Sequence, residues 1–130
     1  MMIKEEMKPA LQGIVPSCIV TCSKDGIPNA TYISQVYYVD EEHVALSHQF
    51  FNKSIRNIRE NPKASVNIVS PEDFGMWKLD LQYSHSENEG ELYDQMSLQL
   101  EAIASMTGME DVFKLKSAEV FKIIAVQQIA

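Results

Sequence analysis

The sequence predicts a mainly β protein, an antiparallel barrel of six strands with flanking helices, folded as one domain over residues 1–130. Three observations predict it. Six segments are rich in β-forming residues, Asp25 and Gly26 mark a tight hairpin between the first two, and the segments do not alternate regularly with helices. Strands joined by hairpins favour an antiparallel barrel over a doubly wound sheet. A chain of this length can bury such a core without disulfides or a structural metal.

The first part of the chain predicts one helix followed by three strands. Ile3, Met7 and Leu11 recur at helical spacing, which predicts a short amphipathic helix ending at Gly13. The strands are predicted at residues 14–22, 29–39 and 43–47. Because only short turns separate them, we expect a three-stranded antiparallel meander.

A short helix and two strands are predicted next. The helix begins at Asn52 or Ser54, either of which can cap it, and it stops before Pro62, which cannot continue it. The strands are predicted at residues 63–69 and 76–86. Alternating polar and apolar residues put Trp77, Leu79, Leu81 and Tyr83 on one face of the second strand.

The longest predicted helix precedes the last strand. Asn88 and Glu91 resemble a capping box at its start, and Gly108 closes it. Between them, Leu92, Met96, Leu100 and Ile103 form an apolar stripe at helical spacing. A final strand is predicted at residues 118–126, which are rich in Val, Phe and Ile.

The charge balance argues against two classes of partner. With a net charge of −7 and a pI near 4.9, the chain lacks the broad basic surface that nucleic acids and anionic membranes require. Its apolar runs are far shorter than the ~20 residues of a spanning helix. Glu5 and Glu6 fall where a signal peptide would carry its apolar core. We therefore expect a cytoplasmic protein with no nucleic-acid or membrane partner.

The cysteines and histidines predict no metal site. In an extended strand the Cα atoms of Cys18 and Cys22 would be about 13 Å apart at ~3.3 Å per residue, which is too far for a disulfide. No cysteine or histidine spacing is typical of zinc, and His43 and His85 have no partner at ligand spacing. We expect both cysteines to be buried thiols.

The stretch from Leu46 to Pro62 concentrates more chemistry than any other. Residues 53–63 hold four of the 11 basic residues, Lys53, Arg56, Arg59 and Lys63, opposed only by Glu60. Backbone N–H groups and the macrodipole at the first turn of a helix favour negative charge, and Lys53 adds a full positive charge there. This pattern predicts a site for a small anion, with phosphate the best fit. The alternative for Lys53 and Ser54 is a solvated helix cap.

Several short motifs also occur in a distinctive order. They are Val15-Pro16, Asp25-Gly26-Ile27-Pro28-Asn29, Tyr32-Ile33-Ser34-Gln35-Val36, Ala45-Leu46-Ser47, Phe51-Asn52-Lys53-Ser54, and Asn57-Ile58 followed by Asn61-Pro62. In this order and spacing the chain resembles the FMN-binding split barrels related to pyridoxamine 5′-phosphate oxidase. The resemblance covers roughly residues 10 to 126.

The resemblance implies a six-stranded split barrel that forms a homodimer, with FMN in clefts between the subunits. The cofactor-binding residues that it implies are Ser34, Gln35, Val36, Ser47, His48, Asn52, Lys53 and Ser54. The first three would face the flavin ring through backbone groups, and the next two would contact the ring or the ribityl chain. The last three would hold the phosphate. Trp77 either packs in the core or the dimer interface, or lies near the partner's flavin.

The resemblance implies a small FMN-binding flavoprotein, an oxidoreductase of unknown substrate whose catalytic residues the sequence does not identify. A non-catalytic flavin sensor or carrier is one alternative. A relative that binds haem or a deazaflavin is another, with His48 as the candidate haem ligand. Family oxidases recognise pyridoxal substrates through a C-terminal segment containing Arg and His, but this chain has neither after His85. We therefore do not expect pyridoxamine 5′-phosphate oxidase activity itself.

Overall fold

The fold is an antiparallel sheet with helices at its margins. The computed structural model describes residues 3–11, 15–33, 35–48, 52–108 and 115–130. The elements in these ranges are η1 (Glu5–Leu11), β1 (Ser17–Cys22), β2 (Pro28–Ile33), β3 (Val36–Asp40), β4 (His43–His48), α1 (Asn52–Glu60), β5 (Lys63–Val69), β6 (Met76–Glu87), α2 (Glu91–Thr107) and β7 (Ser117–Gln128).

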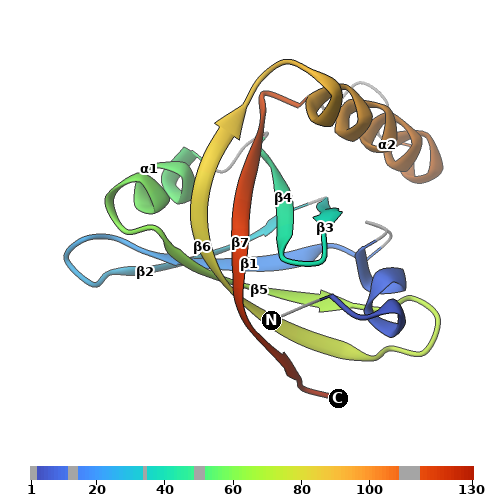
Figure 1. Cartoon of the computed structure of the whole chain (residues 1–130), viewed down its shortest axis with the longest axis horizontal. Coiled ribbons are helices and arrows are strands. Elements are labelled where there is room, and N and C mark those ends of the chain that lie inside the picture. The colour runs from blue at the N-terminus through green and yellow to red at the C-terminus, as the bar shows by residue number, and fades with distance from the viewer. Residues whose placement is uncertain (1–2, 12–14, 34, 49–51, 109–114) are drawn as a thin grey trace.

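All strands of the described residues join one sheet in the order β2-β1-β5-β6-β7-β4-β3. Every pairing is antiparallel, and β6 with β7 forms the longest ribbon, running from Trp77 opposite Gln128 to Glu87 opposite Ala118. The sheet curls on itself, so that β3 and β4 lie across from β1 and β2 (Figure 1). The predicted antiparallel barrel fold with flanking helices is confirmed.

The predicted strand count and meander are wrong in one place. The strand expected at residues 29–39 is two strands, β2 and β3, so the described part of the chain contains seven. β2 and β3 lie at opposite edges of the sheet, since β1 pairs with β2 and β5, and β4 pairs with β3 and β7. The break falls at Gln35, whose buried amide donates to Met96 O of α2 at 3.3 Å. A buried polar side chain that is hydrogen-bonded to α2 interrupts the alternation of polar and apolar residues that a continuous strand needs.

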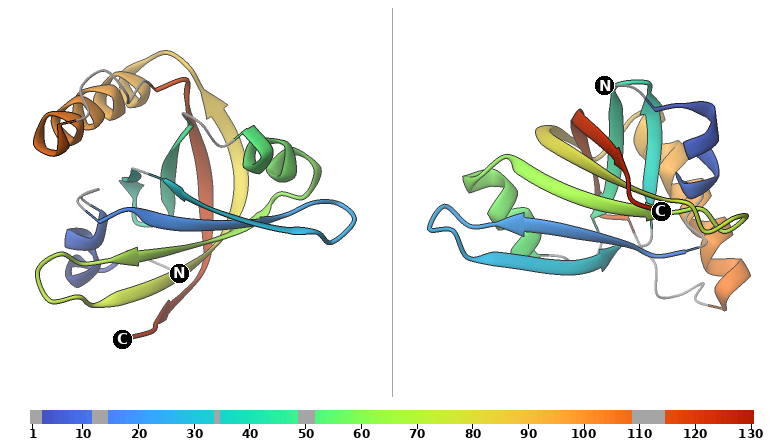
Figure 2. Two further views of the ribbon diagram at one scale, coloured as in Figure 1. Left: turned by 180° about the vertical axis from the view of Figure 1, so that it is seen from behind. Right: turned by 90° about the horizontal axis from the view of Figure 1, so that it is seen from below.

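Two apolar clusters stabilise this arrangement. The larger fills the barrel with side chains from η1, α1 and most strands, and its fully buried members include Met7, Ile58 and Phe121. η1 and α1 lie on opposite sides of the barrel in both Figure 1 and the rear view of Figure 2. The smaller cluster contains Met96 and Val120 and lies between α2 and the outer face of β4 and β7.

The helices differ in detail from the predictions. The N-terminal segment is a 3-10 helix that contains Pro9, so its apolar residues are buried as expected in a tighter turn. The capping box at Asn88 is absent, because α2 begins at Glu91 and Gly90 is the N-cap residue with no side-chain cap. Gly108 ends α2 as expected, at φ 73°, where glycine carries little steric cost. None of the helices in the described ranges is long and apolar enough to cross a membrane.

Candidate functional site

Helix α1 is fixed on the barrel by two hydrogen bonds to neighbouring strands. Asn29 of β2 donates from Nδ2 to Ser54 Oγ at 3.1 Å, and Asn57 donates from Nδ2 to Thr21 Oγ1 of β1 at 3.0 Å. Thr21 and Asn29 are partners in the β1–β2 ladder, so they present their side chains on the same face. Ser54 and Asn57 are almost completely buried. These contacts set both the position and the rotation of the helix.

The polarity of this helix start suits an anion. The first turn of α1 contains no acidic residue, and Arg59 lies in the last turn, where it complements the dipole. Ser54 Oγ accepts from Asn29, so its own proton remains to donate. The backbone of Asn52 and Lys53 belongs to α1, while their side chains lie outside the described part of the structure. Backbone amides and a buried hydroxyl form a donor set that fits a phosphate group.

Four other predicted residues come together where β3 and β4 meet. Val36 is the ladder partner of Leu46, and Ser47 N donates to Gln35 O at 3.4 Å, so Gln35 and Val36 lie beside Ser47 and His48. Three residues then connect His48 to the first residue of α1. Ser34 lies outside the described residues. The chain therefore links the end of β4, where these four residues gather, to the start of α1 through three residues.

The side chain of His48 is held by the last strand. His48 Nδ1 lies 3.1 Å from Ser117 Oγ, and the two residues are partners in the β4–β7 ladder. The backbone continues the link, because Lys116 N donates to His48 O at 2.9 Å. The Gln35 side chain, by contrast, is held by α2: its Nε2 lies 2.5 Å from Gln99 Oε1, and its buried Oε1 has no hydrogen-bond partner among the residues that the structure describes. The Gln35 side chain is therefore directed toward α2, while its backbone carbonyl lies beside Ser47.

Trp77 does not join this group within one chain. The residue is 5% exposed, and its side chain belongs to the barrel core near the start of β6. The opposite end of that strand, Glu87, is level with Ala118, next to the His48 partner Ser117. Ten residues of strand separate Trp77 from Glu87, a distance on the order of 30 Å. The core interpretation of Trp77 agrees with this position.

Three residues near the site were not singled out from the sequence. The sequence placed Asn29 only in a hairpin motif and at the start of a predicted strand, and Thr21 only in a strand, while Ser117 fell just before the strand predicted at residues 118–126. Strand parity could have grouped Asn29 with Thr21, because ladder partners share a face. The crossing of α1 over that face has no signature in the local sequence. In the described part of the chain no group of three or more His, Cys, Asp or Glu residues could hold a metal ion.

Two cavities open along the sheet. The larger has a volume of about 520 Å³ and is lined by residues of β1, β5 and β6, with Lys63 and Asp80 among them. The smaller has a volume of about 330 Å³ and opens between β4, β6 and β7. Val20 and Tyr32, on the outer face of β1 and β2, are exposed apolar residues close to the larger cavity.

Comparison with protein families gives a match over nearly the whole chain. The model of the pyridoxamine 5′-phosphate oxidase family matches residues 3–124. An uncharacterised protein of Methanocaldococcus jannaschii is 34% identical over 73 residues, which cover 55% of this chain. The aligned segment spans about half, 48%, of the length of that curated relative.

Solved structures share the fold at low sequence identity. An FMN-binding protein of Syntrophomonas wolfei has a TM-score of 0.77 and 19% identity, covering 97% of this chain and 87% of that one. An F420 reductase has a TM-score of 0.68 and 14% identity, covering 96% and 98% of the two chains. HutZ, the haem storage protein of Vibrio cholerae, has a TM-score of 0.61 and 21% identity, covering 98% and 95%.

Proposed function

The chain belongs to the pyridoxamine 5′-phosphate oxidase family, and from this premise we propose that it is a small flavoprotein that binds FMN. The observation that carries the proposal is the donor set at the start of α1, where Asn29 orients a buried Ser54 hydroxyl in a turn free of acidic residues. A flavin mononucleotide has a dianionic phosphate at one end, which is the group that such a helix start stabilises.

The phosphate end of FMN would be held by three kinds of donor. The first-turn amides of α1 and the hydroxyl of Ser54 would donate hydrogen bonds, and Lys53 would supply the full positive charge. Asn52 would complete this end of the site. Asn29 would act through Ser54, because its amide already occupies the acceptor side of the hydroxyl.

The flavin ring would lie toward the junction of β3 and β4. Backbone groups of Ser34, Gln35 and Val36 would face the ring, and Ser47 and His48 would contact the ring or the ribityl chain. The contact between His48 Nδ1 and Ser117 Oγ holds the imidazole in place, which supports a role for His48 in orienting the flavin. Bound FMN would supply the redox chemistry, and the chain would bind and orient it.

The flavin site would be completed by a second copy of the chain. Support comes from the outer face of β1 and β2, where Tyr32 is 75% exposed and Val20 is 39% exposed. Exposed apolar residues that cluster on one sheet face are typical of an interface. In such a homodimer Trp77 would belong to the core of each subunit rather than to the flavin site of its own chain.

An oxidoreductase and a flavin sensor or carrier both remain consistent with this site. They differ in turnover: an oxidoreductase would pass electrons from a reduced nicotinamide to an acceptor, whereas a sensor would bind FMN tightly without steady-state turnover. A deazaflavin or haem is the second candidate ligand, supported by the fold shared with an F420 reductase and with a haem storage protein.

The test is the absorbance spectrum of the purified protein, followed by identification of any released chromophore. FMN gives two visible bands, a deazaflavin a single band at shorter wavelength, and a haem a Soret band. We expect flavin bands, or a rise in thermal midpoint on adding FMN to colourless protein. Light scattering with and without FMN tests the dimer. Colourless protein with no FMN-dependent thermal shift would contradict the proposal.

A further inference from the structure

A second polar cavity, about 330 Å³ in volume, opens on the outer face of the sheet. It is lined by His43, Gln82, Tyr83, Ser84, Lys122 and Ile124. None of these is acidic, although the chain has 18 acidic residues against 11 basic ones. The lining therefore consists of an imidazole, a lysine ammonium group, an amide, two hydroxyls and one aliphatic side chain, an arrangement that favours an anionic ligand.

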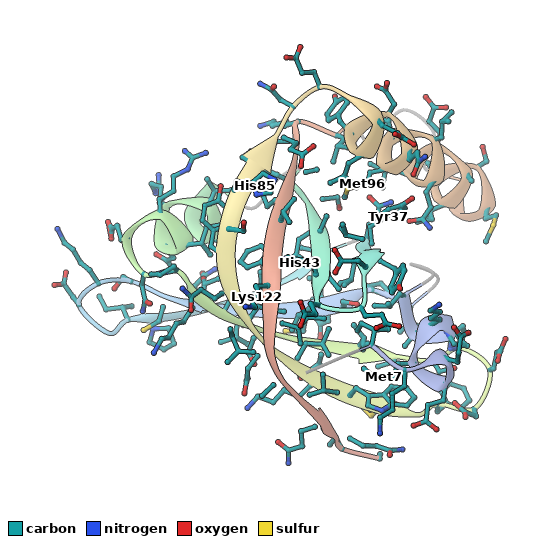
Figure 3. The ribbon with its side chains drawn as sticks, in the orientation of Figure 1. Met7, Tyr37, His43, His85, Met96 and Lys122 are labelled. Carbon is teal, nitrogen blue, oxygen red and sulfur yellow. The ribbon has the colours of Figure 1, made fainter. Side chains whose placement is uncertain are left out.

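The sheet register brings the polar groups into one row. Lys122 of β7 is the ladder partner of His43 on β4 and of Gln82 on β6. Directly opposed residues of an antiparallel pair have Cβ atoms about 5 Å apart, so the three side chains are neighbours across three strands. Figure 3 shows His43 and Lys122 close together on the front of the barrel.

The turn before β4 fixes the imidazole of His43. His43 Nδ1 lies 2.9 Å from Asp40 Oδ1, and the same oxygen accepts the backbone N–H of Glu42 at 2.8 Å. Partial burial works to raise the pKa of Asp40, but the hydrogen bonds from His43 and from Glu42 N–H outweigh it and hold that pKa below its ordinary value. An ionised Asp40 keeps the proton on Nδ1 and leaves Nε2 for a ligand.

The acidic groups near the cavity are engaged by other residues, among them the buried Glu119, which accepts from Tyr83 Oη at 3.3 Å and does not line the cavity. The carboxylate of Asp40 is paired with His43, and Glu41 interacts electrostatically with Lys8 of η1. Glu42 is exposed and does not line the cavity. Lys122 is exposed and takes part in none of the ion pairs found among the described residues. On β6, His85 is paired with Glu87 beyond the cavity.

We propose that this cavity is a binding site for a small organic anion, a carboxylate or phosphate monoester carried on a single ring or short apolar chain. Lys122 and the imidazole of His43 bind the anionic group, and the amide of Gln82 donates to it. Ile124, which is 50% exposed, packs against the apolar part. A volume of about 330 Å³ lies at the lower end of ligand pockets, which suits a molecule of one ring.

The site is separate from the proposed flavin site. His43 begins β4 and His48 ends it, which puts them roughly 17 Å apart at about 3.4 Å per residue. Ligand binding at His43 is therefore expected with or without FMN, and its failure leaves the flavin proposal untouched.

The experiment titrates the full chain with benzoate and with phenyl phosphate, using neutral benzamide as the control ligand, and follows His43 by NMR. We expect saturable binding of at least one anion and none of benzamide. The preferred anion distinguishes a carboxylate from a phosphate ligand.

Lys122→Met should weaken anion binding about tenfold or more, because it removes the charge that contacts the ligand. Lys78→Met, on the neighbouring strand β6 and outside the cavity, is the matched control and should have no effect. Both side chains lie on the outer face, and thermal midpoints check that each variant is folded. Equal binding of benzamide, no saturation by either anion at millimolar concentration, or equal effects of the two substitutions would overturn the proposal.

Discussion

Asn29 and Ser54 lie 25 residues apart in the sequence, and their side chains are joined by a 3.1 Å hydrogen bond from Nδ2 to Oγ. Asn29 lies on β2 and Ser54 in the first turn of α1. Because the amide donates, the hydroxyl is left to donate its own proton elsewhere. This contact links the position of the helix to the direction of a buried hydroxyl at the proposed phosphate site.

The first prediction concerns this pair. Ser54→Ala should weaken FMN binding by about 1.5–3 kcal/mol, or roughly 10- to 100-fold, because it removes a hydrogen bond to a charged group. Asn29→Ala should have a smaller effect, and the double variant should bind no more weakly than Ser54→Ala. Riboflavin, which lacks the phosphate, should bind all three variants like the unmodified chain. Isothermal titration with both flavins measures the cycle.

A control for helix position is available in the same element. Thr21→Val breaks the bond to Asn57, which docks α1 on β1 through the same face but lies beyond the first turn. It should lower the free energy of unfolding by about 1–3 kcal/mol, since it leaves a buried amide without its partner. If Thr21→Val also impaired FMN binding as strongly as Ser54→Ala, helix docking rather than hydroxyl orientation would explain both results.

The second prediction concerns charge at the helix start. Lys53→Ala should weaken FMN binding and reduce its dependence on salt, because the lysine would face the phosphate directly. Lys63→Ala makes the same charge change at the exposed first residue of β5 and should leave FMN affinity unchanged. Thermal melts should show both variants folded. Equal affinities for Lys53→Ala and Lys63→Ala would remove Lys53 from the site.

Most of the fold could be predicted from local sequence because each element carries its own signal. Strand alternation, the Asp25-Gly26 turn at φ 86° for the glycine, and Gly108 at the end of α2 are all confirmed. The junction of β2 and β3 was missed because its cause is not local. Gln35 is buried by contacts with Met96 and Gln99, more than 60 residues later in the chain.

The candidate site was predictable only in part for the same reason. A basic helix start is visible in one short window, so Lys53 and Ser54 could be found from sequence. Asn29 and Ser117 contribute through pairings between distant strands and helices, which no window contains. The position of Trp77 was left open between core and flavin. The sheet register decides where Trp77 lies, since it pairs Trp77 with Gln128, at the end of the β6–β7 ribbon opposite to Ala118.

The third prediction concerns a buried phenol and carboxylate. Glu119 is 0% exposed and accepts hydrogen bonds from Tyr83 Oη at 3.3 Å and from Ser86 Oγ at 2.5 Å. Burial, followed by the charge and hydrogen bond of Glu119, raises the pKa of Tyr83 above its ordinary value of 10.0. The folded state therefore holds the phenolic proton more tightly than the unfolded state does.

This raised pKa fixes the sign of the pH dependence. The stabilising contribution of Tyr83 is complete below about pH 10 and is lost as pH rises through the folded-state value. Tyr83→Phe should lower stability at neutral pH, since Glu119 loses a partner, and should flatten the alkaline decline. Tyr32→Phe, at a tyrosine that is 75% exposed, is the control and should keep the decline. Urea unfolding between neutral and alkaline pH measures both, and parallel curves for the two variants would count against the pair.

The last prediction concerns the packing of Trp77 against the turn before β6. A Cβ added at Gly75 would lie 2.9 Å from Trp77 Cη2, closer than real Cβ atoms approach another atom, and 3.1 Å from Asp73 Oδ1, which is a tight contact. Gly75→Ala should therefore destabilise the chain by about 1–3 kcal/mol through overpacking. Trp77→Phe, which removes the clashing atoms, should relieve much of that cost in the double variant. FMN affinity should stay unchanged in all three, because Trp77 lies at the far end of β6 from the proposed site. Additive stability losses would contradict the packing argument, and weaker FMN binding by Trp77→Phe would instead support contact with the partner's flavin.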